Sequence, residues 1–118
     1  MNIEQLREYC LSLPHATEKF PFDEETLVFY VGDVKMFALI DLGNPDRTSL
    51  KCAPDRAIVL RERYSSIVPA WHFNKKHWNT VFLQGDAPDT LIEELIHHSY
   101  DLVVASMTKK QRQTVTGS

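Results

Sequence analysis

Two apolar runs separated by Gly32-Asp33 constrain the fold of this chain more than any other feature of its sequence. A Gly-X pair between such runs is typical of a β-hairpin with a two-residue type II′ turn. That turn would bring three cross-strand pairs to one face: Val31 with Val34, Phe29 with Met36, and Leu27 with Ala38. The opposite face of the hairpin carries four further apolar residues: Val28, Tyr30, Phe37 and Leu39. The pattern therefore predicts an antiparallel pair with one buried face and a second apolar face.

A helix is predicted before the hairpin, because apolar residues recur at helical spacing from Ile3 to Leu13. Asn2 is its expected N-cap, with Gln5 as the capping-box partner, and Pro14 ends it. Residues 15–25 show no periodicity, so we expect a loop into which Phe20 and Phe22 tuck.

The second half of the chain alternates between strand and helix patterns. A capping box of Thr90 and Glu93 opens the last helix, whose apolar stripe continues to Met107. The other expected elements are a strand over residues 48–52, a helix over 54–64 with a buried stripe of Ala57, Leu60 and Tyr64, and strands over 67–73 and 78–83 joined by the four-residue loop 74–77. These elements predict an α+β fold, an antiparallel sheet with helices packed on it. We expect a single domain over residues 1–108 and a polar, disordered tail over 109–118.

Composition places the chain among globular proteins, with 118 residues of which 43% are hydrophobic and 25% charged. The chain opens with a charged amphipathic segment rather than a signal peptide, and no stretch approaches the roughly 20 apolar residues that cross a bilayer. Cys10 and Cys52 form no disulfide framework and sit in apolar patterns, so both are expected to be small buried hydrophobes. A reducing cytoplasm is the expected location.

Charge is distributed unevenly along the chain. Residues 47–78 contain seven basic residues and two acidic ones, a net charge of +5, so the remainder carries −8 of the total of −3. The seven cations are Arg47, Lys51, Arg56, Arg61, Arg63, Lys75 and Lys76. Within this segment, aromatic residues and cations alternate from Trp71 to Trp78, a pattern that can hold phosphates and stack on bases. Packing of these aromatic residues into the core is an equally supported alternative.

Patterns that carry catalysis are absent from the sequence. His72 and His77 are five residues apart, and His97 and His98 are adjacent, so neither pair has the spacing of a helical zinc site. Ser65-Ser66 lacks the glycines of a nucleophile elbow, and the four glycines form no phosphate-binding loop. The sequence therefore predicts a protein that is not an enzyme and that holds neither a cofactor nor a metal.

Several segments together resemble the MmcQ/YjbR family of small bacterial proteins. They are the helix ending at Leu13-Pro14, the strand Ser49-Leu50-Lys51 leading to Pro54, the run from His72 to Val81 (HFNKKHWNTV), and the later Pro88-Asp89 and Ser99-Tyr100. The family is described as DNA-binding through a double-wing motif, with a fold similar to that of CyaY, the bacterial frataxin. The resemblance covers residues 1–108 and implies a CyaY-like α+β fold and DNA binding.

Three functions remain open from the sequence. The leading hypothesis is weak, sequence-nonspecific DNA binding, with phosphates contacted by a basic wing and a helix flank. Its expected contact residues are Lys51, Arg56, Arg63, His72, Asn74, Lys75, Lys76 and His77, with Arg47 and Arg61 widening the strip. The alternative is a protein-interaction or small-ligand module that uses the second apolar face of the hairpin. The third, suggested by the frataxin-like fold alone, is metal binding through Glu4 and Glu8.

Overall fold

A computed structural model describes residues 1–70 and 73–117 of the chain. In this part of the chain, six strands form one antiparallel sheet in the order β1-β2-β3-β4-β6-β5. The strands are β1 (Ala16–Lys19), β2 (Thr26–Val31), β3 (Lys35–Asp41), β4 (Arg47–Lys51), β5 (Ile67–Pro69) and β6 (Trp78–Phe82). The helices are α1 (Ile3–Ser12), α2 (Pro54–Arg63), α3 (Asp89–Ser106) and α4 (Lys109–Thr116). The predicted α+β class with helices on an antiparallel sheet is confirmed.

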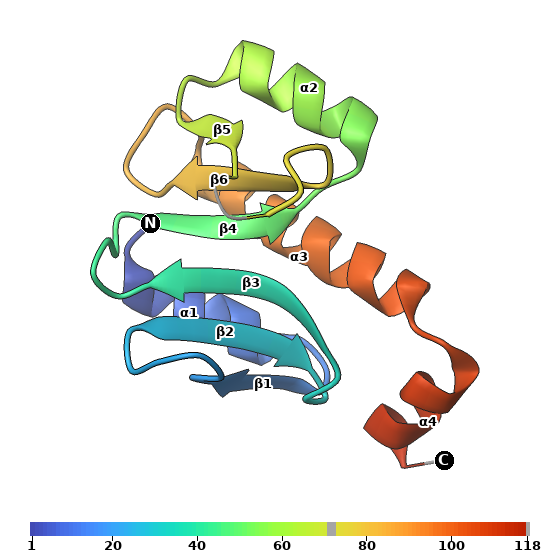
Figure 1. Cartoon of the computed structure of the whole chain (residues 1–118). Helices are drawn as coiled ribbons and strands as arrows, with labels where there is room; N and C mark the ends of the chain where they lie inside the picture. The colour runs from blue at the N-terminus through green and yellow to red at the C-terminus, as the bar shows by residue number, and fades with distance from the viewer. Residues whose placement is uncertain (71–72, 118) are drawn as a thin grey trace.

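Helices α1 and α3 lie behind the sheet in Figure 1, and α3 crosses β3 and β4. Alternate residues of a strand point to opposite faces, so one set of side chains meets the helices. On this helix-covered face Phe29, Phe37 and Ile96 are fully buried, and Phe37 meets Tyr100 edge-on with ring centroids 5.4 Å apart. The core therefore sits between the sheet and the helices. The opposite side, which faces the viewer in Figure 1, is called the open face below.

The hairpin of β2 and β3 forms where the sequence predicts it, but with a different turn and register. Gly32 and Asp33 both have positive φ, +56° and +62°, which matches a type I′ turn rather than type II′. The register shifts between Phe29, which pairs with Ala38, and Tyr30, which pairs with Met36. Phe37 is the additional residue at this bulge, and a bulge turns the side chain of the extra residue. Phe37 therefore enters the core instead of the second apolar face.

Two segments expected to be irregular are ordered elements. Residues 16–19, predicted as loop, form β1 because they pair with β2. Residues 109–116, predicted as a disordered tail, form α4, whose capping box joins Thr108 and Gln111. Val115 of α4 lies so close to the hairpin turn that a Cβ on Gly32 would approach its side chain to 2.6 Å. Both segments are thus ordered, and both contact the hairpin.

Three local predictions were also wrong. Phe20 and Phe22 do not tuck into the core, since they are 49% and 70% exposed. Helix α3 begins without a side-chain cap, so the box of Thr90 and Glu93 is not formed. Strand β5 ends at Pro69, earlier than expected, and the predicted strand residues 71 and 72 lie outside the described residues.

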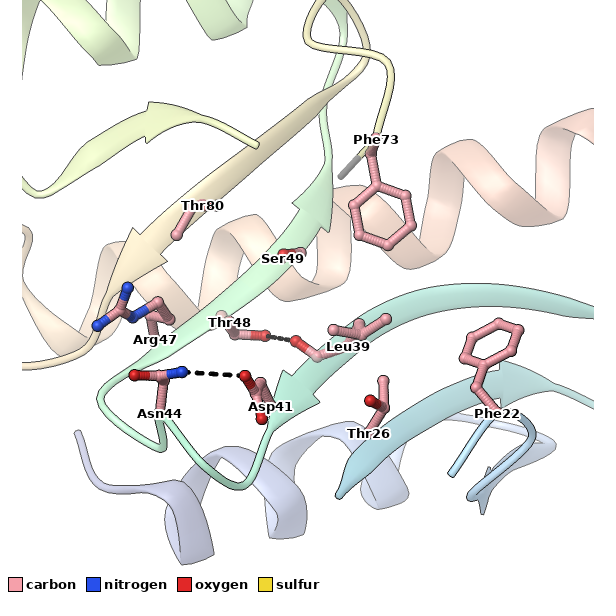
Figure 2. Close-up of a pocket in the computed structure, with 10 residues that line it drawn as sticks. All are labelled: Phe22, Thr26, Leu39, Asp41, Asn44, Arg47, Thr48, Ser49, Phe73 and Thr80. Atoms are coloured by element: carbon pink, nitrogen blue, oxygen red, sulfur yellow. Dashed lines mark hydrogen bonds between the residues drawn. The ribbon is translucent and has the colours of Figure 1, made fainter. Parts of the chain in front are cut away.

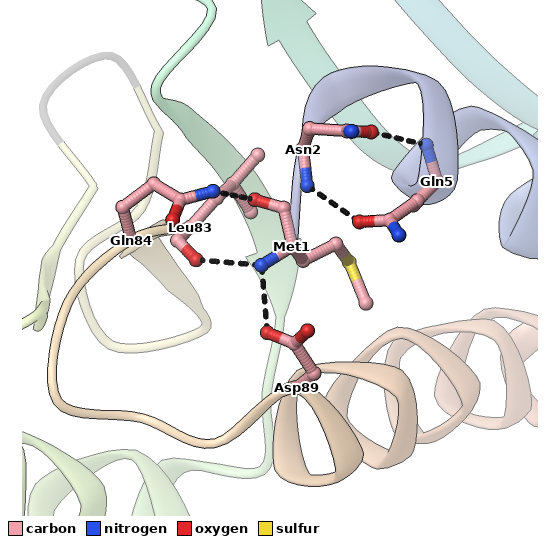
Figure 3. A network of polar contacts seen from close by, with 6 residues as sticks. All are labelled: Met1, Asn2, Gln5, Leu83, Gln84 and Asp89. Carbon is pink, nitrogen blue, oxygen red and sulfur yellow. Dashed lines mark hydrogen bonds and ion pairs between the residues drawn. The ribbon is translucent and has the colours of Figure 1, made fainter.

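The helix predictions were otherwise accurate. The capping box of Asn2 and Gln5 opens α1, with the Gln5 N–H 2.8 Å from Asn2 Oδ1 (Figure 3). Helix α2 begins at Pro54 and buries Ala57 and Leu60, while Tyr64 is half-buried. The predicted apolar stripe of α3 faces the core: Ile92, Leu95, Ile96 and Val103 are buried, and so is Met107 at its C-cap.

A polar network at the N-terminus joins α1 to the segment that follows β6 (Figure 3). The Met1 ammonium donates to the Leu83 carbonyl at 3.2 Å and to Asp89 Oδ1 at 2.7 Å. Gln84 in turn donates to the Met1 carbonyl at 2.6 Å. These contacts connect α1, the end of β6 and the start of α3, and so align the two core helices.

Candidate functional site

The predicted loop Asn74–His77, called the cationic loop below, is held by a residue of α2. The Arg61 guanidinium donates to Asn79 Oδ1 at 2.7 Å, to the Trp78 carbonyl at 3.3 Å and to the Lys75 carbonyl. Asn79 is 2% exposed, so this bond satisfies a buried amide. Arg61 was expected to be an additional phosphate contact, but its guanidinium instead holds the loop in position.

The cationic loop is also closed by its own backbone. Asn74 accepts the Lys76 N–H on its side chain at 2.9 Å and the His77 and Trp78 N–H groups on its carbonyl at 3.0 Å. The His77 carbonyl accepts the Cys52 N–H at 2.8 Å, which joins the loop to the end of β4. Asn74 and His77 are thus turn-forming residues, and the loop projects the exposed side chains of Lys75 and Lys76.

Lys51 and Trp78 are cross-strand partners at the foot of this loop. The ring of Phe73 stacks on Trp78 with centroids 4.8 Å apart and an angle of 24° between their planes. Lys51, Lys75 and Lys76 therefore lie around an aromatic stack at one end of the open face. His72, another predicted contact residue, lies outside the described residues.

The structure separates the remaining predicted cations from this cluster. Arg56 forms an ion pair with Glu94 of α3 at 2.6 Å, and so turns towards the helix-covered side. Arg63 lies over the Tyr64 ring at 5.6 Å. Arg47 bonds to Asp46 at 2.9 Å and lies 4.8 Å from the centre of the Phe82 ring, at the other end of β4. The predicted basic strip is therefore divided, and its compact part is the three lysines.

A groove of about 470 Å³ lies on the open face between these two ends of β4 (Figure 2). Its lining residues come from the loop before β2 and from β2, β3, β4, the β3–β4 turn, the cationic-loop approach and β6. They are Phe22, Thr26, Leu39, Asp41, Asn44, Arg47, Thr48, Ser49, Phe73 and Thr80. Figure 2 shows the two phenylalanine rings on one side and Asp41, Asn44 and Arg47 on the other.

The polar end of the groove presents an ionised carboxylate beside a guanidinium. Hydrogen bonds from the Asn44 side chain and the Gly43 N–H hold the pKa of Asp41 below its ordinary value. Hydrogen bonding to Asp46 raises the pKa of Arg47. The Asp41 carboxylate is therefore ionised at neutral pH and can accept hydrogen bonds. The positive charge of the adjacent Arg47 is balanced by Asp46.

The sequence pointed to only part of this groove. Leu39 belongs to the predicted second apolar face, and Phe73 and Arg47 belong to the basic segment. Phe22, Asp41 and Asn44 were missed: Phe22 and Asn44 come from loops, and Asp41 ends β3, so they meet only in the folded chain. The available signal was Asp23 beside Phe22, since aspartate favours turns, and in the structure Asp23 accepts the Glu25 and Thr26 N–H groups at 2.8 and 2.7 Å.

Both cysteines and two of the histidines lie away from the groove. Burial raises the pKa of Cys10 to about 12 and also raises the pKa of Cys52. His98 accepts the Ala53 N–H at 3.2 Å, and His97 lies 3.5 Å from Asp101. Within residues 1–70 and 73–117, no three His, Cys, Asp or Glu side chains are placed to hold a metal ion, and no described helix is long and apolar enough to cross a bilayer.

Comparisons with known proteins agree on one group of relatives. A family model described as YjbR matches residues 11–102. The chain is 35% identical to the uncharacterized protein YjbR of Escherichia coli K12, over 96% of each chain, and 30% identical to the uncharacterized protein YbdF of Escherichia coli O157:H7, over 95% of this chain and 92% of that one.

Two solved structures share the fold. The crystal structure of protein DR2400 from Deinococcus radiodurans is similar with a TM-score of 0.86 and 45% identity, covering 98% of this chain and 88% of that one. A crystal structure of a Pseudomonas syringae protein is similar with a TM-score of 0.75 and 29% identity, covering 87% of this chain and 99% of that one.

Proposed function

The chain belongs to the YjbR family, and from this premise we propose that it is a non-enzymatic nucleic-acid-binding module of the cytoplasm. Membership confirms the family resemblance found in the sequence, and that resemblance implied DNA binding. Phosphates are contacted by Lys75 and Lys76 of the cationic loop and by Lys51 at its foot. Binding is weak and largely independent of base sequence in duplex DNA, because contacts of this kind position the backbone without reading bases.

The observation that carries this proposal is the rigid presentation of two adjacent lysines. Arg61 and the turn around Asn74 hold the loop backbone, so its conformation is determined before any ligand arrives. A preorganised loop loses less conformational entropy on binding than a mobile one. Lys75 and Lys76 are exposed at its tip, where long cationic side chains can reach phosphate oxygens.

Electrostatics support a small contact area rather than an extended basic strip. The net charge of −3 opposes long-range attraction of a polyanion, and Arg47 and Arg56 are each paired with an acid. The attraction of phosphate then depends on the local charge of the three lysines. This argues for modest affinity and a strong dependence on salt.

The non-enzymatic part of the proposal is supported by the state of the reactive side chains. Both cysteines are free and buried with raised pKa values, so neither supplies a thiolate at neutral pH. Free buried thiols also fit a reducing compartment.

Charge reversal of the loop tests this function. We expect Lys75→Glu/Lys76→Glu to lower the affinity for both duplex and single-stranded DNA by at least tenfold, because the local charge changes from +2 to −2. Fluorescence anisotropy measures the binding, and circular dichroism checks the fold.

Lys109→Glu/Lys110→Glu is the matched control, since it makes the same change in net charge at the start of α4, an element separate from the cationic loop. Acidic residues at a helix N-terminus are tolerated or favourable. Equal losses in the two double variants would show a general charge effect and would contradict a binding loop.

A further inference from the structure

The groove on the open face is a second, chemically distinct feature beside the phosphate-binding lysines. It begins at Phe73, the residue that directly precedes the cationic loop, and ends at Asp41 and Asn44. An elongated ligand could therefore place an anionic part at the lysines and a planar part in the groove.

The aromatic end has exposed π faces held in place. Phe22 is 70% exposed, yet its loop is fixed by the Asp23 carboxylate, which accepts two backbone N–H groups and the Thr26 hydroxyl. Phe73 is supported from behind by its stack on Trp78. Exposed aromatic rings on a fixed scaffold are the usual stacking platform for unpaired bases.

The floor and size of the groove suit one flat polar ligand. Ser49 and Thr80 are cross-strand partners on the open face, and Leu39 pairs with Ser49 from the neighbouring strand. This places two hydroxyl groups beside one apolar side chain. A volume of about 470 Å³ lies in the range of small-ligand pockets and exceeds the need of a single base.

The polar end can distinguish bases by their hydrogen-bond donors. The Asp41 carboxylate is oriented by Asn44 at 3.0 Å and by the Gly43 N–H at 2.9 Å, and each of its oxygens retains a further lone pair. A carboxylate accepts from the exocyclic amino group of cytosine or adenine, whereas thymine has no amino group and offers only its ring N3–H.

We propose that this groove binds the base of an unpaired nucleotide that carries an exocyclic amino group, with its phosphate at the cationic loop. The inference rests on the proposed function, and it narrows the ligand to single-stranded nucleic acid or a free nucleotide. Both sources present the same chemistry, a flat amino-bearing base joined to a phosphate.

The experiment compares labelled oligo-deoxycytidine with oligo-deoxythymidine by fluorescence anisotropy. Phe22→Ala should weaken oligo-deoxycytidine binding by about tenfold through loss of stacking. Phe20→Ala is the matched control, because Phe20 is 49% exposed on the same loop and does not line the groove. Asp41→Asn should reduce the preference for cytosine over thymine, while the side chain keeps its shape.

Competition by deoxycytidine monophosphate separates the two sources. Displacement of the oligonucleotide by micromolar deoxycytidine monophosphate would support a free nucleotide as the ligand. If the oligonucleotide binds and the monophosphate does not displace it, the ligand is a single strand. Absence of binding by both ligands would overturn the inference.

The variants also separate this inference from the proposed function. Loss of binding in Lys75→Glu/Lys76→Glu, with Phe22→Ala equal to Phe20→Ala, would overturn the groove and keep the phosphate-binding loop. The reverse pattern, sensitivity to Phe22→Ala with no effect of the loop variant, would keep the groove and overturn the loop.

Discussion

Arg61 shows how one residue can belong to a basic segment without contacting a ligand. Its three hydrogen bonds close the space between α2, β6 and the cationic loop. Hydrogen bonds to charged donors are stronger than neutral ones, and the acceptors here include a buried amide. The guanidinium of Arg61 therefore stabilises the fold through these hydrogen bonds.

Replacing Arg61 by alanine should destabilise the protein by about 1–3 kcal/mol, because the buried Asn79 amide and the Lys75 carbonyl lose this donor. The Trp78 carbonyl keeps the Ala70 N–H. Urea unfolding measures the free energy. Arg63→Ala is the control on the same helix, where the side chain is exposed, and it should cost within about 0.5 kcal/mol. Equal costs in the two variants would refute the positioning role.

At the scale of elements, α2 is attached to α3 by polar contacts at its first turn. His98 accepts the Ala53 N–H, an N-terminal donor of α2 that has no side-chain cap. The contact needs an unprotonated Nε2. Burial, followed by the charge of Arg56, lowers the pKa of His98, and Asp101 and Glu94 act in the opposite direction.

This contact predicts a pH dependence with a definite sign. The folded-state pKa lies below the ordinary value of 6.5, so the unfolded state binds more protons between the two values. Stability should therefore fall as the pH drops below about 6.5, and the loss is complete below the folded-state pKa.

Urea midpoints at about pH 7.5 and about pH 5.5 measure this fall. His98→Gln should show a smaller difference between the two, and His97→Gln should behave as the unchanged protein. A wild-type pH difference retained in His98→Gln would exclude this contact as its origin.

For the whole molecule, the net charge is −3, although residues 47–78 alone carry a net charge of +5. Three lysines at one end of the open face imply about three neutralised phosphates. The logarithm of the duplex affinity should then fall with the logarithm of salt concentration at a slope near −2.7, and near −2.1 for a single strand. Anisotropy titrations over a range of salt concentrations measure this slope, and a flat dependence would remove the electrostatic mechanism.

Local sequence signals determined much of this protein. The box of Asn2 and Gln5, Pro54 at the start of α2 and the apolar stripe of α3 each depend on residues close in the chain, so their helices were predictable. The Thr108–Gln111 box is a signal of the same kind that would have predicted α4. The Gly32-Asp33 pair located the hairpin for the same reason.

The hairpin register, the pairing of β1 and the composition of the groove depend on contacts between segments that are distant in the chain. Phe37 enters the core because a bulge allows it to meet Tyr100, a contact between residues far apart in sequence. Phe22, Asp41 and Phe73 come together because the strand order brings two separate loops and the end of β3 to one face. Short-range sequence patterns determine the conformation of a single segment. A binding surface depends on which distant segments pack side by side, and that is set by the free energy of packing the whole chain.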